Sequence, residues 1–212
     1  MYKEIDFDKW NRKEVFKFFD EFEDPSFNIT ANVNVSRLFR LCKREDISFS
    51  MALLFFSQKS VNQIREFKTR LLDGLPVEFD EVEATQTLLN DDESFSFCYF
   101  KSAETLREFI KAGVLARETY SRLKTFDVET ERIDLCFYSV IPWVSFTSFK
   151  NAKRSIRKDT IPRIVFGKYF EAEIELLIPV SVEVNHLMMD GVHVGKYYRN
   201  LQTYLDAPEE YL

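Results

Sequence analysis

The hydrophobic and polar positions of the chain follow two different periods. In residues 27–35 apolar and polar side chains alternate almost strictly, as in a half-buried strand. In residues 12–22 the apolar side chains Val15, Phe16 and Phe19 recur at the intervals of an amphipathic helix. The same reasoning predicts further helices over residues 36–44, 50–67, 102–123 and 192–205, and further strands over residues 85–89, 95–100, 133–141, 144–149, 163–168 and 172–185.

Turn and cap residues organise the middle of the chain. Asp73 and Gly74 separate two apolar runs, and this pair favours a hairpin. Ser102 stands in front of a long helical pattern, as an N-cap would. No repeat or Pro/Gly/Ser-rich linker interrupts the sequence, so we expect residues 1–212 to form a single domain. Hairpins mixed with intervening helices predict an α/β (α+β) two-layer sandwich, in which helices cover a mixed β-sheet.

Composition narrows the class of partner. The net charge of −6 excludes nucleic acid as the main partner, because phosphate binding depends on clustered Lys and Arg. No apolar run approaches the roughly 20 residues that span a bilayer, and the charged start of the chain is unlike a signal peptide. We therefore expect a cytoplasmic protein without a membrane partner. The 22 Phe residues indicate a large aromatic core or an apolar ligand cavity.

The cysteines and histidines argue against metal chemistry. Cys42, Cys98 and Cys136 are widely spaced in apolar surroundings, which is typical of buried reduced thiols. The two histidines are seven residues apart, and the sequence has neither a paired cysteine motif nor an HExxH pattern. We expect no metal site.

Both histidines lie in one stretch, IPVSVEVNHLMMDGVHV, at residues 178–194. With a period of two, His186 falls on the same side as the aliphatic residues of the strand expected over residues 172–185. Desolvation on an apolar face favours the neutral imidazole, which can accept a proton. Two interpretations stay open from these residues alone: a general base, or a core histidine satisfied by backbone groups, which is the commoner case.

A second polar side chain stands in an apolar row. Leu135, Phe137, Ser139 and Ile141 share one side of the strand expected over residues 133–141. A buried hydroxyl needs a partner, so Ser139 is either an oxyanion donor or a group bonded locally to backbone, and the residues alone favour the local bond.

Four segments in the same order resemble the chloramphenicol acetyltransferase family. VNHLMMDGVHVGKYYRNLQ is similar to its carboxyl-terminal signature, a histidine followed four residues later by Asp-Gly and a helix. DKWNRKEVFKFF resembles its Trp-x-Arg-x-x-x-Phe start, SVNQIREFKTRL its middle helix and following strand, and SVIPWVSFTSF its Ser-x-x-Pro-Trp segment. Each pattern is short, but together they span the whole chain and imply the family's fold.

The resemblance implies catalytic roles for four residues. His186 corresponds to the family's general base, and Ser139 to the hydroxyl that stabilises the tetrahedral intermediate. Asp190 corresponds to an aspartate that pairs with an arginine to shape the site, and Arg12 to that arginine. A carboxylate before glycine also starts turns and helices, so Asp190 has a structural interpretation as well. His193 also matches a family histidine, which we interpret as a packing element.

The resemblance further implies direct acyl transfer from acetyl-CoA, as co-substrate, to a hydroxyl of a small-molecule acceptor, without an acyl-enzyme and without a metal. Trp143, Lys168 and Tyr169 correspond to positions beside coenzyme A, with Tyr169 packing on adenine. Family members are homotrimers with active sites at subunit interfaces, so the same assembly is expected. The expected acceptor-binding residues are Phe19, Phe27, Phe95, Phe97 and Val165.

Departures from the family pattern concentrate around the acceptor. Asn185 stands where a second histidine is usual, and Val165 where many members have a threonine that helps to hold a water. Phe19 replaces a tyrosine, and Phe97 a small residue. Residues 150–159 are far more basic than the family segment. These changes concern the choice of acceptor more than acyl transfer itself.

Three functional hypotheses follow. The first is a CoA-dependent O-acetyltransferase acting on chloramphenicol or a similar hydroxyl compound, with antibiotic resistance as the implied role. The second is the catalytic core of a dihydrolipoyl acyltransferase, which shares the fold and an HxxxDG motif, although we find no lipoyl domain or linker before the core. The third is a non-catalytic or altered-specificity member that binds another ligand in the same cavity.

Overall fold

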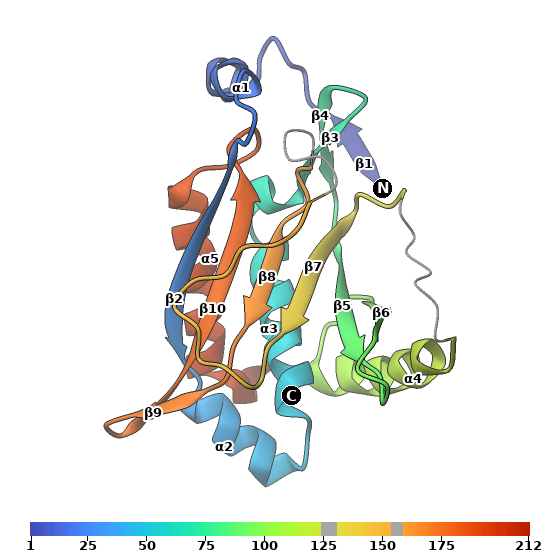
Figure 1. Cartoon of the computed structure of the whole chain (residues 1–212), viewed down its shortest axis with the longest axis vertical. Coiled ribbons are helices and arrows are strands. Elements are labelled where there is room, and N and C mark those ends of the chain that lie inside the picture. The colour runs from blue at the N-terminus through green and yellow to red at the C-terminus, as the bar shows by residue number, and fades with distance from the viewer. Residues whose placement is uncertain (124–130, 154–158) are drawn as a thin grey trace.

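The largest element of the computed structural model is a seven-stranded mixed sheet (Figure 1). The structure describes residues 1–123, 131–153 and 159–212. Its strands are β2 (Ser26–Asn34), β5 (Glu83–Leu89), β6 (Phe95–Phe100), β7 (Leu135–Val140), β8 (Arg163–Phe166), β9 (Phe170–Ala172) and β10 (Glu175–Asn185). The order is β2-β10-β8-β7-β5-β6, and β9 pairs with β10. Strand β7 runs parallel to β5 and β8, whereas the other pairs are antiparallel.

Helices cover one face of this sheet, as the sequence predicted (Figure 1). The helices are α2 (Ser36–Glu45), α3 (Phe49–Asn62), α4 (Leu106–Leu123) and α5 (Gly191–Asp206), with short 3₁₀ turns η1 (Arg65–Lys68) and η2 (Pro208–Tyr211). Helix α1 (Lys13–Asp20) lies beyond one end of the sheet and not on this face (Figure 1). Helix α3 is apolar on nearly all sides and is buried along most of its length, as expected of a helix enclosed by other elements. The main core lies between α3, α5 and the sheet. The two-layer fold class is confirmed.

A small second sheet, β1-β4-β3, lies beside the large one. Its strands are β1 (Tyr2–Glu4), β3 (Thr69–Leu72) and β4 (Leu75–Phe79). Asp73 and Gly74 have φ angles of 50° and 83°, the left-handed pair that a two-residue hairpin requires, so this predicted turn is confirmed. Strand β1 was not predicted, because it is short and exposed.

Two helix boundaries differ from prediction. The helix expected over residues 50–67 ends at Asn62, because Ile64 has extended backbone and η1 follows. The predicted N-cap Ser102 is wrong: α4 begins at Leu106. The Thr105 hydroxyl accepts from the Glu108 N–H at 3.3 Å, and the Glu108 carboxylate accepts from the Thr105 N–H at 3.2 Å. This reciprocal exchange is the stronger start signal.

Two strand predictions were also wrong. Residues 144–149 are not a strand, since β7 already has neighbours on both sides and only single bonds, such as Lys168 N–H to Val144 O at 2.9 Å, tie this segment to the sheet. The strand expected over residues 172–185 is the hairpin of β9 and β10, which turns at Glu173 with a φ of 56°. Ile174 therefore lies at the tip and is 96% exposed instead of facing inward.

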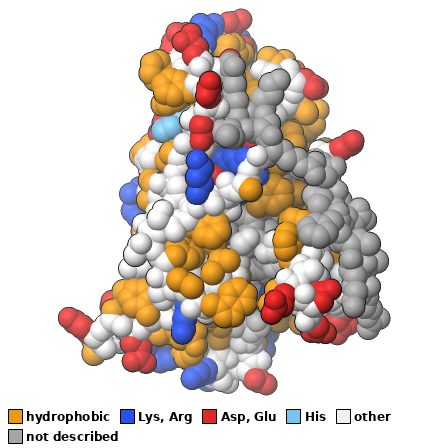
Figure 2. Space-filling model, in the orientation of Figure 1, with side chains coloured by type: hydrophobic (Ala, Val, Ile, Leu, Met, Phe, Trp, Pro, Cys, Tyr) orange, Lys and Arg blue, Asp and Glu red, His pale blue; other side chains and the backbone are white. Residues whose placement is uncertain are grey.

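The segment that follows β7 crosses the sheet face opposite the helices (Figure 1). A Cβ added to Gly167 would lie 2.6 Å from Pro179 Cγ and 3.1 Å from Val144 O, so only glycine permits this close crossing. Hydrophobic side chains gather on this face below a band of mixed charge (Figure 2). Within the described residues, every helix is too short or too polar to traverse a bilayer. The single domain over residues 1–212 stays a prediction.

Candidate active site

His186 lies immediately after β10, not within a buried row. The predicted alternation holds for Ile178, Val180, Val182 and Val184, which point into the core. The backbone N–H of His186 donates to Pro25 O at 2.9 Å, which continues the pairing of β10 with β2 by one bond. Its side chain is 26% exposed, so the expectation of a histidine desolvated among aliphatic neighbours needs correction. The strand ends here, and the imidazole remains accessible.

A buried turn holds His186 in place. Leu187, Met188 and Met189 are fully buried. Asn185 fixes the turn, because its side-chain oxygen accepts the Leu187 N–H at 2.9 Å and its amide donates to Asp159 O at 3.1 Å. Where the family usually has a second histidine, this chain therefore has a residue that bonds the backbone on both sides.

Two phenylalanines enclose the imidazole of His186. The ring of Phe19 stacks on it at 4.2 Å with an interplanar angle of 6°, and Phe27 stacks on it at 4.1 Å and 24°. Phe27 comes from β2 and Phe19 from α1. Acceptor binding by these two residues stays a prediction; in the structure they fix the plane of the imidazole.

Asp190 and Arg12 complete the surroundings of His186. Nδ1 of His186 lies 3.1 Å from Oδ1 of Asp190. Arg12 donates to both carboxylate oxygens of Asp190 and, at 2.9 Å, to the backbone oxygen of His186. The hydrogen bond from Arg12 holds the pKa of Asp190 below its ordinary value of 3.8, with a further contribution from His186 against the effect of burial. The structure thus brings three of the four predicted catalytic residues together.

The fourth, Ser139, lies elsewhere in the chain. It stands on β7 opposite Val165 of β8, which in turn pairs with Ser181 of β10. Ser181 and His186 are five residues apart, or roughly 17 Å along the strand, and two strand spacings add roughly 10 Å across the sheet. Within one chain, Ser139 and His186 cannot contact the same small molecule at its reacting atoms.

The row that contains Ser139 was also assigned to the wrong face. Cys136 and Tyr138 point into the core, whereas Phe137 and Ser139 are half-buried on the face crossed by the chain. The Ser139 hydroxyl accepts from Thr87 Oγ1 at 3.3 Å. This leaves its own proton available to a ligand. The partner of the Ser139 hydroxyl is therefore the Thr87 side chain and not the local backbone group that one interpretation expected.

The remaining acceptor residues are also far from His186. Phe95 and Phe97 make a T-shaped contact with ring centroids 5.7 Å apart on the edge strand β6. This strand is four strands from β10, or roughly 19 Å. Phe95 is 41% exposed, whereas Val165 is buried. The predicted site residues therefore form one group around His186 and another around Ser139.

The predicted coenzyme A residues form a third group. Lys168 and Tyr169 line a mostly apolar pocket of about 350 Å³ between α3, β8 and β10. The ring centroid of Tyr169 lies 5.4 Å from that of Phe39 and 6.0 Å from that of Phe49. Tyr169 is 42% exposed. Trp143 is 63% exposed on the segment that crosses the sheet. Both aromatic side chains can therefore present a ring to a ligand.

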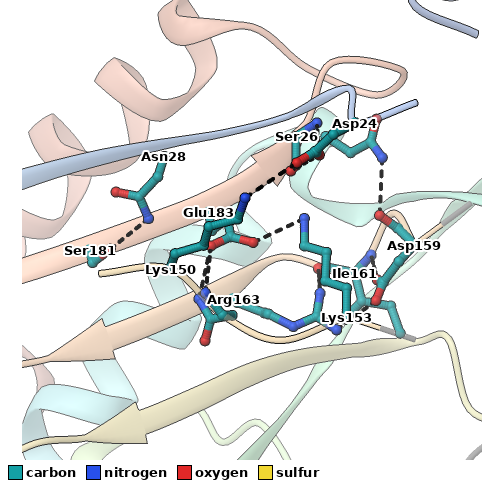
Figure 3. Close-up of polar contacts among 12 residues, drawn as sticks. Asp24, Ser26, Asn28, Lys150, Lys153, Asp159, Ile161, Arg163, Ser181 and Glu183 are labelled. Carbon is teal, nitrogen blue, oxygen red and sulfur yellow. Dashed lines mark hydrogen bonds and ion pairs between the residues drawn. The ribbon is translucent and has the colours of Figure 1, made fainter. Parts of the chain in front are cut away.

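Sequence reasoning missed a charged cluster on the crossed face of the sheet (Figure 3). Glu183 is 3% exposed. One of its carboxylate oxygens pairs with Lys153 at 3.0 Å, and the other accepts from the Asn151 N–H at 2.9 Å. Beside it Arg163 pairs with Asp159 at 2.6 Å. The alternation along β10 indicated that Glu183 opposes the valines, but nothing in the sequence identified its partner. The cluster fixes residues 150–153 over the sheet.

The cysteines are as predicted. Cys42, Cys98 and Cys136 are free and buried. Burial raises the pKa of the Cys42 thiol to about 11 and those of Cys98 and Cys136 to about 12, which keeps them protonated and unreactive. Among the described residues, no three His, Cys, Asp or Glu side chains gather as a metal site would require.

Comparisons with known proteins identify the family that this chain resembles. Residues 1–202 match the family model "Chloramphenicol acetyltransferase". The chain is 27% identical to the chloramphenicol acetyltransferase of Proteus mirabilis, over 95% of this chain and 94% of that protein. It is 28% identical to that of Staphylococcus aureus, over 100% of this chain and 99% of that protein. A solved chloramphenicol acetyltransferase structure superposes with a TM-score of 0.92 at 24% identity, covering 97% of this chain and 100% of the other.

A dihydrolipoamide acetyltransferase from Azotobacter vinelandii shares the fold more distantly. Its TM-score is 0.69 at 13% identity, covering 90% of this chain and 85% of that chain. Because the family match extends over nearly the whole sequence, the chain belongs to the chloramphenicol acetyltransferase family and is an acyltransferase.

Proposed function

We propose that this protein is a CoA-dependent O-acetyltransferase that moves an acetyl group from acetyl-CoA to a hydroxyl of chloramphenicol or a similar small molecule, with His186 as general base. One observation carries the proposal. The imidazole of His186 has Nδ1 bonded to Asp190, while Nε2 has no hydrogen-bond partner among the described residues. Acyl transfer to an alcohol requires a base for the hydroxyl proton, and Nε2 of this ring can act as that base.

The hydrogen bond to Asp190 selects the tautomer of His186. Arg12 keeps the Asp190 carboxylate ionised, and an ionised carboxylate only accepts. The proton of a neutral imidazole therefore resides on Nδ1, and Nε2 retains the lone pair. Nε2 takes the proton from the acceptor hydroxyl as its oxygen attacks the thioester carbon.

The second group of residues would stabilise the intermediate. Negative charge develops on the thioester oxygen, and the Ser139 hydroxyl donates to it. When the tetrahedral intermediate collapses, the carbon–sulfur bond breaks and the thiolate of CoA takes the proton from Nε2. The ring returns to its starting state without an acyl-enzyme and without a metal.

The distance between Ser139 and His186 supports a homotrimer. The two side chains can serve one reaction only if they come from different subunits, as in the assembly that the family resemblance implies. In a cyclic trimer each interface is heterologous, so one surface supplies His186 with Phe19 and Phe27. The neighbour's other surface supplies Ser139, Phe95 and Phe97, and the buried Val165 lies beside Ser139.

The third group fits acetyl-CoA as co-substrate. The exposed faces of Tyr169 and Trp143 offer stacking surfaces for adenine, and Lys168 beside Tyr169 offers a positive charge for phosphate. The apolar pocket next to them suits the less polar parts of the molecule. Since acetyl-CoA is a cytoplasmic metabolite, we propose a cytoplasmic enzyme, and antibiotic resistance as its role if chloramphenicol is the acceptor.

The test is release of CoA thiol from acetyl-CoA with and without chloramphenicol, by the wild-type protein and by His186→Ala. We expect release only in the presence of the drug and only from the wild type. Binding of CoA without turnover on chloramphenicol or other small alcohols would favour a non-catalytic member. Acetylation of dihydrolipoamide in preference to alcohols would favour the dihydrolipoyl acyltransferase alternative.

A further inference from the structure

We propose that His193 is a positioning residue: its ring accepts the backbone N–H of Asp190 and thereby holds the carboxylate that orients His186. The inference rests on the proposed function of His186. In this proposal His193 acts through a hydrogen bond to Asp190 and not only through packing.

The contacts of His193 define its protonation state. Its Nδ1 accepts the Asp190 N–H at 2.9 Å, in the place that a glutamate takes in a capping box. A ring nitrogen that accepts carries no proton, so the proton of the neutral ring is on Nε2. That atom lies 3.4 Å from Oε1 of Glu66, in η1. His193 is 9% exposed, and each nitrogen of this nearly buried ring has a partner.

These contacts link His193 to the reacting imidazole. Asp190 N-caps α5 with extended backbone, so its peptide plane determines where its carboxylate points. That carboxylate contacts Nδ1 of His186 and the guanidinium of Arg12. Rotation of the Asp190 peptide would displace the carboxylate from both. Small displacements of this kind lower rates by up to roughly a hundredfold.

Protonation of His193 would break the link. A protonated ring has no lone pair at Nδ1, so two N–H donors would face each other. Burial lowers the pKa of His193 from its ordinary value of 6.5, and the charges of Arg12 and Lys196 also lower it. Glu66 and Asp190 act in the opposite direction. The neutral ring therefore predominates at neutral pH, and the link fails only as the pH falls through the folded-state pKa, which lies below 6.5.

The experiment compares His193→Gln, which keeps an acceptor but cannot be protonated, with His193→Leu, which has none. We measure kcat and KM against pH, and the hydrogen exchange rate of the Asp190 amide. We expect kcat to fall roughly tenfold to a hundredfold in His193→Leu with little change in KM, and to recover to within about threefold of wild type in His193→Gln. The acid limb of the kcat profile should be shallower in His193→Gln than in wild type, because one titrating group is missing.

Amide exchange tests the link without any turnover. Protection of the Asp190 amide should fall in His193→Leu, persist in His193→Gln, and be lost at acid pH in wild type alone. Val192→Ala, at a position 59% exposed, controls for general effects at the start of α5.

Wild-type kcat and protection in His193→Leu would overturn the proposal, as would an equal kcat loss in both variants. If no acceptor is acetylated at all, the proposed function fails, while amide exchange still decides whether His193 holds Asp190. If His193→Leu does not fold, the pH dependence of His193→Gln decides alone.

Discussion

Nδ1 of His186 and Oδ1 of Asp190 lie 3.1 Å apart, although one residue follows the end of β10 and the other begins α5. The intervening turn of Leu187, Met188 and Met189 is fully buried. A site held by a packed turn between a strand and a helix keeps its geometry better than one on a free loop. The imidazole is thus oriented before any ligand binds.

Loss of the base should affect rate far more than stability. We expect His186→Gln to lower kcat by roughly two to four orders of magnitude. Since the side chain is 26% exposed, the melting temperature should change little. Steady-state thiol release and thermal unfolding check this, with Val192→Ala as the control. A variant that retains a tenth of wild-type kcat would show that another group removes the proton.

The ion pair of Asp190 with Arg12 should make stability depend on pH. The folded-state pKa of Asp190 is depressed below 3.8, so the ion pair stabilises the fold above pH 3.8. This stabilisation is lost as the pH falls through the lower folded-state pKa. Asp190→Asn should lower the free energy of unfolding at neutral pH by about 1–2 kcal/mol, because Arg12 is left largely buried without its partner.

Denaturant unfolding at several pH values checks this prediction. The stability difference between wild type and Asp190→Asn should be largest above pH 3.8 and shrink below it. The exposed pair of Lys13 with Asp8 is the control, since Asp8→Asn should have almost no effect. A difference that does not vary with pH would contradict the assigned role of the charge.

Local patterns predicted most elements, because they depend on neighbours in sequence. Asp73 and Gly74 specified their hairpin, and the alternation along β10 identified its core face. The strand prediction for residues 144–149 failed although V-S-F-T at residues 144–147 alternates like a strand. Whether a strand forms also depends on a free sheet edge, and β5 and β8 already flank β7. The period of two likewise continued through His186, but a sequence pattern does not show where the sheet ends.

The site was predictable in part from the alternation pattern, which singled out His186 and Ser139, and otherwise only as far as the family resemblance extended. The resemblance added Asp190 and Arg12, which the fold brings together with His186. The pairing of Glu183 with Lys153 across 30 positions and the contact of Glu66 with His193 left no local signal, because they depend on tertiary register. Sequence also gave no distance between Ser139 and His186, which follows from strand order alone.

The stacked rings should control the orientation of the imidazole. We expect Phe19→Leu and Phe27→Leu each to lower kcat about twofold to tenfold, since an aromatic contact contributes about 0.5–1.5 kcal/mol beyond burial. Phe18→Leu is the matched control, because Phe18 is 60% exposed on the same helix and contacts Phe19 and Phe22. Equal effects in all three variants would indicate that these rings act through general packing.

A shared interface should permit complementation. Chains with His186→Ala and chains with Ser139→Ala should each be nearly inactive as pure trimers. With random mixing, three quarters of the trimers have one interface that combines an intact His186 with an intact Ser139, so co-expression should restore about a quarter of wild-type activity. Activity no higher than that of the pure variants would show that no active site combines the two residues from neighbouring chains. An active Ser139→Ala trimer would instead exclude Ser139 from catalysis.

Val165→Thr tests whether the acceptor site has changed its chemistry. Val165 is 1% exposed and pairs with Ser139 on one side and Ser181 on the other, so a threonine hydroxyl there has neighbours with which to bond. The family threonine helps to hold a water near the transition state, so we expect kcat with chloramphenicol to rise severalfold if the drug binds as in other members. The buried hydroxyl should reduce stability by about 1 kcal/mol or less when bonded. Val165→Ala removes volume without adding a hydroxyl and serves as the control. A loss of kcat in Val165→Thr, with Val165→Ala unaffected, would indicate that this enzyme binds a different acceptor against an apolar wall.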